Sequence, residues 1–200
     1  MGPADIVFEA VHRFGEAMRE IGLELQPSKC SCFSPQTQLD THPARPTAMP
    51  VGGFVLSSGR QVHGIKVGGI PIGEGEYIAK FLDDKVTDVL STISKIINEL
   101  RDRHLQSLYT LTYYSLNVTF QYWLQHCYPQ EVLAAADRVD TAILQVACTC
   151  IGPQLLVDDL AQRRLRLPAR MFGGGLRLQR RLAPAAFVGT LCKCLPDFLD

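Results

Sequence analysis

The stretch from His104 to Gln130 contains no Asp, Glu, Lys or Arg, and this constrains the fold more than any other feature of the chain. It is long enough to span a bilayer, but several amides and a histidine interrupt its apolar character. We therefore expect no membrane span and a helix covered by its neighbours. Five aromatic residues of this stretch are predicted to pack in the core rather than stack on bases: Tyr109, Tyr113, Tyr114, Tyr122 and Trp123.

Apolar residues repeat at helical spacing on both sides of this stretch. The pattern predicts a helix from Val7 to Ile21, stopped by Gly22, and another of roughly six turns from Ile78 to Leu100. A third helix is predicted from Val132 to Ala147. The C-terminal half is therefore expected to be a helical bundle.

The region between the first two helices is predicted to be extended or irregular. Alternation over Leu23–Leu25 predicts a short strand, with Lys29–Phe33 as its partner or continuation. Four prolines and two glycines mark residues 34–53 as a loop, and Phe54–Ile72 is typical of β-structure with turns. The expected class is α+β, mainly α, divided into residues 1–75 and 76–200.

Charge is balanced overall but uneven along the chain. The 20 basic and 20 acidic residues cancel, which excludes a uniformly basic nucleic-acid coat. From Leu160 to Pro196, however, there is no acidic residue. This segment is either a phosphate-binding surface without base specificity or an ordinary solvated face. Its arginines are Arg163, Arg164, Arg166, Arg170, Arg177, Arg180 and Arg181.

The seven cysteines form three C-x-C pairs and one single residue. An odd count argues against a closed disulfide framework and for reduced thiols, and hence for an intracellular protein of the cytoplasm or nucleus. Apolar packing of these small side chains is one interpretation, and a metal site assembled from the pairs is the other. The residues are Cys30, Cys32, Cys127, Cys148, Cys150, Cys192 and Cys194.

A family resemblance is carried by three segments, Phe14–Cys30, Ile65–Gly73 and Leu167–Leu178. Together they resemble the reverse transcriptases of retrotransposons, in particular the non-LTR type. Phe14–Cys30 is similar to the helix and strand that follow the catalytic aspartates in that family, with Gln26 where the family has asparagine. Ile65–Gly73 resembles the hairpin that grips the primer end, with Gly68, Gly69 and Ile70 at its turn. Leu167–Leu178 is similar to a glycine-rich stretch found downstream in many of these polyproteins.

This resemblance implies a parent enzyme that synthesises DNA on RNA with Mg²⁺ and deoxynucleotides. Lys29 matches the lysine that approaches the phosphates of the incoming nucleotide, where an ammonium offsets developing charge. The chain starts after the family's catalytic aspartates, so it is expected to be an inactive palm-end and thumb-like fragment without a cofactor of its own. Its expected partners are a primer–template duplex and the missing upstream palm and fingers region. The alternatives are a helical protein-interaction module and a decayed retrotransposon reading frame.

One motif imitates a catalytic pair. Phe81-Leu82-Asp83-Asp84 matches the family's aspartate motif in letters, but it lies within the helix predicted from Ile78 to Leu100. Asp83 and Asp84 should occupy the solvated face of that helix, because Phe81 and Leu82 occupy its apolar stripe. We therefore predict no metal site at this pair.

Overall fold

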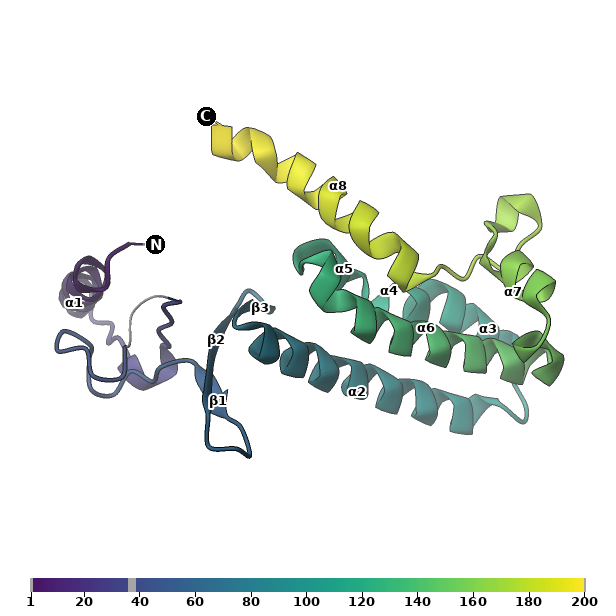
Figure 1. Ribbon diagram of the computed structural model, residues 1–200, viewed down its shortest axis with the longest axis horizontal. Helices are drawn as coiled ribbons and strands as arrows, with labels where there is room; N and C mark the ends of the chain where they lie inside the picture. The colour runs from purple at the N-terminus through teal and green to yellow at the C-terminus, as the bar shows by residue number, and fades with distance from the viewer. Residues whose placement is uncertain (1, 36–38, 200) are drawn as a thin grey trace. The chain divides into compact units, whose positions relative to one another are not determined.

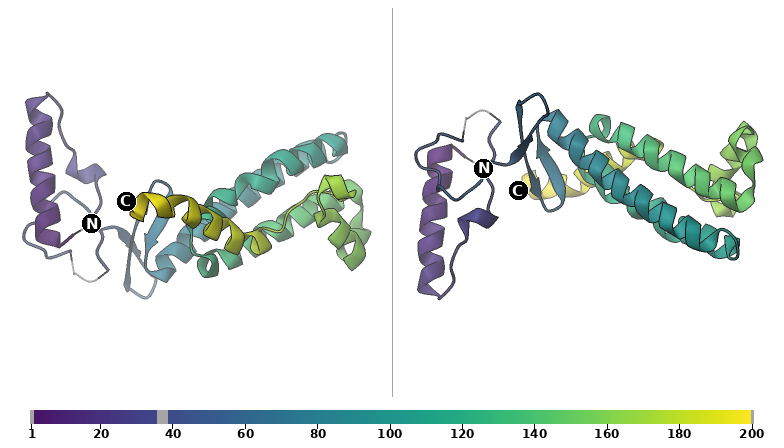
Figure 2. Two further views of the ribbon diagram at one scale, coloured as in Figure 1. Left: turned by 90° about the horizontal axis from the view of Figure 1, so that it is seen from above. Right: turned by 90° about the horizontal axis from the view of Figure 1, so that it is seen from below.

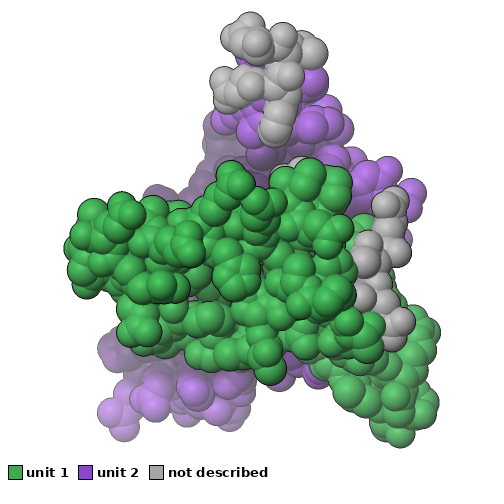
Figure 3. Space-filling view, turned by 90° about the vertical axis from the view of Figure 1, so that its left-hand side faces the viewer, with its two compact units in different colours: residues 1–78 green, residues 79–200 purple. Residues whose placement is uncertain are grey.

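The computed structural model describes residues 2–35 and 39–199, and the chain divides into two compact units at residues 78 and 79 (Figure 3). Each unit has its own core and is considered by itself. None of the helices in the described ranges has the length and apolarity that crossing a bilayer requires. The predicted class, mainly helical with a small amount of β-structure, is confirmed.

The first unit contains one long helix and a small sheet. Helix α1 (Ala4–Glu20) is followed by a 3₁₀ turn, η1 (Pro27–Lys29). The sheet is antiparallel in the order β1-β2-β3, and its strands are β1 (Gly53–Val55), β2 (Gln61–Val67) and β3 (Ile70–Gly73) (Figure 1).

The hairpin of β2 and β3 turns on two glycines. Val67 pairs with Ile70, so Gly68 and Gly69 are the whole loop, with φ of 57° and 87°. Two-residue hairpin loops of this kind need positive φ at both positions, which glycine adopts without steric cost. The hairpin expected at Ile65–Gly73 is therefore present.

The strand predicted at Leu23–Leu25 is absent. Gly22 adopts φ of 79° after α1, and the leucine side chain at position 25 then lies against α1 near Gly15. Pro27 starts the 3₁₀ turn, and of the proposed partner strand only Cys32 forms an isolated bridge, to Val51. The alternating pattern of Leu23–Leu25 did not produce a strand, because Leu25 packs on α1. In the described ranges no strand pairs with this segment.

The proline-rich segment is a loop, as predicted, yet it supplies part of the first unit's core. Leu39 and Met49 from this segment are buried against Phe8 of α1, with Val11 and Cys32 beside them. Residues 36–38 of the predicted loop lie outside the described residues.

The second unit is a helical bundle. Its first helix is α2 (Gly75–Leu100), whose first turn still belongs to the first unit. The return path is α3 (Leu105–Leu111), a π-helical turn η2 (Thr112–Leu116), α4 (Asn117–Thr119) and α5 (Gln121–His126). Helix α6 (Pro129–Ile151) then runs alongside α2 (Figures 1 and 2). The C-terminal elements are η3 (Pro153–Leu156), α7 (Asp159–Arg166), η4 (Ala169–Met171) and α8 (Gln179–Leu199), and α8 packs on α5 and α6.

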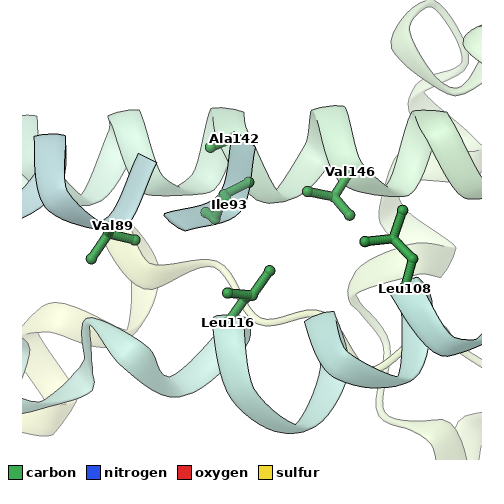
Figure 4. Close-up of a cluster of buried hydrophobic side chains, with 6 residues drawn as sticks. All are labelled: Val89, Ile93, Leu108, Leu116, Ala142 and Val146. Atoms are coloured by element: carbon green, nitrogen blue, oxygen red, sulfur yellow. The ribbon is translucent and has the colours of Figure 1, made fainter. Parts of the chain in front are cut away.

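The bundle core joins three helical layers. Figure 4 shows side chains from α2, from the return path and from α6 pointing into one cluster. Burying each aliphatic side chain contributes roughly 1.5–3 kcal/mol, which holds together helices whose connections are short. The cluster consists of Val89, Ile93, Leu108, Leu116, Ala142 and Val146.

The charge-free stretch is not covered on all sides, which corrects the prediction of a fully buried helix. Tyr114 is 74% exposed and Tyr122 is 39% exposed, so the expectation of core packing is wrong for these two rings. The exposed part of the stretch carries hydroxyl groups in place of charges, and those of Thr110 and Thr119 each donate to the carbonyl four residues earlier. Absence of charge therefore did not mean burial here.

Candidate nucleic-acid interface

Two buried amides, Asn117 and Gln179, anchor the glycine-rich segment to the bundle. The Asn117 side chain donates to the carbonyl of Gly175 at 3.2 Å and accepts the backbone N–H of Arg177 at 2.9 Å. The Gln179 amide donates to the main-chain carbonyl of Asn117 at 2.8 Å. Because both side chains are buried and satisfied, these bonds fix one path for the chain entering α8.

A carboxylate from α6 caps the first turn of α8. Asp140 accepts the backbone N–H of Gln179 at 2.8 Å and that of Arg180 at 3.1 Å. Burial raises the pKa of Asp140, while the two N–H groups and the nearby Arg166 guanidinium act in the opposite direction. Two of the N–H groups that a helix start leaves free are thus used internally.

The three consecutive glycines allow this segment to lie close to α3 and η2. The Tyr109 hydroxyl donates to the carbonyl of Gly174 at 2.7 Å. Gly175 has φ of 71°, and a Cβ there would overlap the ring of Tyr113. A chain with side chains at these positions would have to move away from the bundle, so the glycines set the position of the neighbouring arginines.

The seven arginines of the acid-free segment fall into two groups. Arg163 pairs with Asp159 at 2.8 Å, and Arg180 pairs with Asp137. Arg166 is half-buried, and burial lowers its pKa despite the attraction of Asp140. Arg163 and Arg180 therefore fit the interpretation of the segment as an ordinary solvated face. The others are exposed and take part in none of the ion pairs found among the described residues: Arg164, Arg170, Arg177 and Arg181.

The predicted site residues of the first unit are a lysine and a turn. Lys29 ends the 3₁₀ turn η1 and is exposed. Gly68 and Gly69 form the β2–β3 loop, and Ile70 begins β3. Lys29's role with nucleotide phosphates and the primer-grip role of the hairpin remain predictions.

The aspartate pair of α2 does not fit a two-metal site. Asp83 and Asp84 lie on the helix with side chains 62% and 63% exposed; Asp83 pairs with Arg138, and Asp84 lies 3.7 Å from Lys80. Adjacent helical residues point about 100° apart, so the two carboxylates diverge. Within residues 2–35 and 39–199 no group of three or more His, Cys, Asp or Glu side chains is placed to hold a metal ion.

The cysteines differ widely in environment. Cys127 is buried, and burial raises the pKa of its thiol to about 11. Cys192 and Cys194 are exposed on the distal part of α8, so the interpretation of these two as core residues is wrong. In the described part of the chain, residues 191–196 of α8 are exposed, whereas Gln179 and Ala183 in its first turns are buried.

Sequence reasoning missed the residues that build this region: Asn117, Asp140 and Gln179. One signal was available for Asp140, because it stands beside Val139 on the apolar stripe of α6, where a charge needs a partner. Comparison of the chain with protein-family models, with curated proteins and with solved structures gives no match.

Proposed function

We propose that this chain is the palm-end and thumb-like part of a reverse-transcriptase-like polymerase and binds a primer–template duplex without catalysing extension itself. The observation that carries the proposal is the acid-free segment. Its four exposed arginines take no part in the ion pairs of residues 2–35 and 39–199, and buried amides hold the chain from Gly175 to Gln179 in place. The proposed family rests on the resemblance of three segments, Phe14–Cys30, Ile65–Gly73 and Leu167–Leu178, to reverse transcriptases. Mg²⁺ and deoxynucleotides would belong to the complete enzyme.

The binding mode follows from the chemistry of these side chains. A guanidinium presents a planar fork of donors that suits phosphate oxygens. Arg177 lies two residues before α8, and its backbone N–H donates to the Asn117 side chain at 2.9 Å. Arg181 lies in the first turn of α8, next to Arg180, whose N–H donates to Asp140. Because the first two N–H groups of α8 are already bonded to Asp140, we assign phosphate recognition to the arginine side chains. Such contacts give affinity without sequence specificity.

The test is duplex affinity as a function of salt concentration. Each phosphate contact adds about 0.9 to the slope of log affinity against log salt. Replacing Arg177 and Arg181 together with Ala should lower the magnitude of that slope by about 2. The matched control is Arg101→Ala with Arg103→Ala, two arginines of the turn after α2, and it should leave the slope near the wild-type value. Equal slopes for all three proteins would contradict the proposal.

A second candidate, a helical protein-interaction module, has its own supporting observation. Leu156 and Val157, just before α7, are 53% and 87% exposed, and Leu160 in its first turn is 66% exposed. Apolar side chains at such exposure are typical of surfaces that a partner covers. Failure of duplex binding at low salt would favour this candidate. A decayed reading frame, the third alternative, has no corresponding observation.

A further inference from the structure

Phe172 combines unusual exposure with an unusual backbone. Its side chain is 94% exposed. It adopts φ of 57° and ψ of 28°, and it is the only residue other than glycine with positive φ in the described part of the chain. L-residues avoid this conformation because Cβ approaches the following carbonyl, and glycine is the usual occupant. The sequence places glycine at the next three positions but phenylalanine here.

The turn that carries Phe172 is held firmly from both sides. Its own N–H donates to the carbonyl of Ala169 at 3.0 Å, and Gly173 N–H donates to Pro168 at 3.2 Å. Gly174 N–H donates to the carbonyl of Arg164 at 3.1 Å, while the Gly174 carbonyl accepts the Tyr109 hydroxyl. The ring is therefore presented to solvent by a fixed backbone rather than by a loose end.

The charged residues near this ring in the sequence are all arginines, and Met171 beside it is an exposed apolar residue. Arg170 is two residues away, Arg164 is tied to the turn through its carbonyl, and both side chains are exposed. No acidic residue occurs between Leu160 and Pro196. An exposed ring on a turn that also carries exposed arginines suits an unpaired base next to backbone phosphates. A lipid surface would instead favour a long apolar helical face, and α7 has eight residues.

We propose that Phe172 stacks on an unpaired base at the junction of duplex and single strand, with Arg164 and Arg170 on the adjoining phosphates. This inference rests on the proposed duplex binding and adds the position on the nucleic acid that the segment recognises. Base stacking would explain why phenylalanine occupies this unfavourable backbone conformation, because a glycine would fit the backbone but present no ring.

The probe is a duplex with a short overhang that carries 2-aminopurine at the first unpaired position. Wild-type protein should quench its fluorescence and bind it more tightly than the same duplex with a blunt end. Phe172→Gly and Phe172→Leu should lose the quenching and roughly 5- to 160-fold in affinity for the overhang, with blunt-duplex affinity unchanged. Phe172→Trp should retain both properties.

Two controls separate stacking from a fold defect and from general aromatic exposure. Phe172→Gly should unfold at the wild-type temperature or above, because glycine suits this backbone. Tyr114→Ala removes another highly exposed ring, on the uncharged face, and should leave overhang binding unchanged.

The outcomes distinguish this inference from the function on which it rests. Salt-dependent duplex binding that Phe172→Gly does not alter would overturn the stacking role alone. If the wild-type protein binds no nucleic acid at low salt, both the stacking role of Phe172 and the proposed duplex binding are overturned. Binding to vesicles of anionic lipid that requires Phe172, without quenching of the overhang, would also overturn the proposal and assign the ring to a membrane surface.

Discussion

The carboxylate of Asp140 on α6 accepts the backbone N–H of Gln179 at 2.8 Å, so one helix of the bundle caps the start of another. Asp140→Ala leaves this N–H and that of Arg180 without their acceptor, and we expect a loss of about 2 kcal/mol in the free energy of unfolding. Urea unfolding followed by the fluorescence of Trp123, the only tryptophan, measures it. Asp137→Ala removes only the exposed ion pair with Arg180 and should cost under about 1 kcal/mol. Equal losses would show that the cap is unimportant.

Glu74 should make the first unit sensitive to acid. Its carboxylate accepts the His63 N–H at 2.9 Å and pairs with Arg60 at 2.9 Å; the His63 bond, followed by Arg60, lowers its pKa. A lowered folded-state pKa stabilises the fold above the unfolded value, and this contribution disappears as pH falls through the folded value. The wild-type advantage over Glu74→Gln should therefore shrink from pH 6 to pH 3. NMR-detected urea unfolding of the β2 and β3 amides measures it, and a constant difference would contradict it.

Two glycines of the second unit should respond oppositely to alanine. Gly175→Ala places a Cβ into the Tyr113 ring at a φ of 71°, and we expect a loss of about 2 kcal/mol or more. Gly189→Ala, within α8, meets no atom within 4 Å and should stabilise by up to about 1 kcal/mol through helix propensity. Thermal unfolding compares the two variants. A neutral Gly175→Ala would mean that the segment moves away from the bundle without cost.

Alkylation should sort the thiols by environment. In native protein at pH 8, iodoacetamide should label Cys192 and Cys194 rapidly, while Cys127 should stay unmodified because its thiol is buried and its pKa is about 11. Peptide mass spectrometry identifies the labelled sites, and labelling in urea is the positive control. Rapid native labelling of Cys127 would show that α5 and α6 separate readily.

The chain should not extend a primer. Asp83 and Asp84 diverge on α2, so they cannot clamp two metal ions. We expect no extension with Mg²⁺ or Mn²⁺ and four deoxynucleotides. The double variant Asp83→Asn with Asp84→Asn should lower the free energy of unfolding by less than about 1 kcal/mol, mainly through loss of the exposed ion pair with Arg138. Template-dependent extension that the double variant abolishes would refute both statements.

Hydrophobic periodicity and turn residues predicted the helices and the hairpin whose sequence signals lie within one segment. The stripes from Val7, from Ile78 and from Val132 became α1, α2 and α6, and adjacent glycines at positions 68 and 69 marked the hairpin. Each of these signals lies within one segment, which is why the sequence alone reveals it. The same holds for the helical position of Asp83.

The candidate interface was less predictable because its contacts join distant segments. Asn117 and Gln179 are far apart in the sequence, and nothing local marks either as buried. Arg163 and Arg180 looked equivalent to Arg177 until their acidic partners were known. A charge pattern gives the density of cations, while three-dimensional pairing decides which of them remain available.

Helix α2 has a consequence for the order in which the protein forms during synthesis. The ring of Tyr77, in its first turn, lies so close to Gly64 of β2 that a Cβ there would overlap it, and it stacks on Phe54 of β1. The sheet thus lacks one of its packing partners until the ribosome has released the beginning of α2. Since the later turns of the same helix belong to the bundle, a pause in translation once residue 78 has left the ribosomal exit tunnel would let the N-terminal unit mature before the bundle is complete.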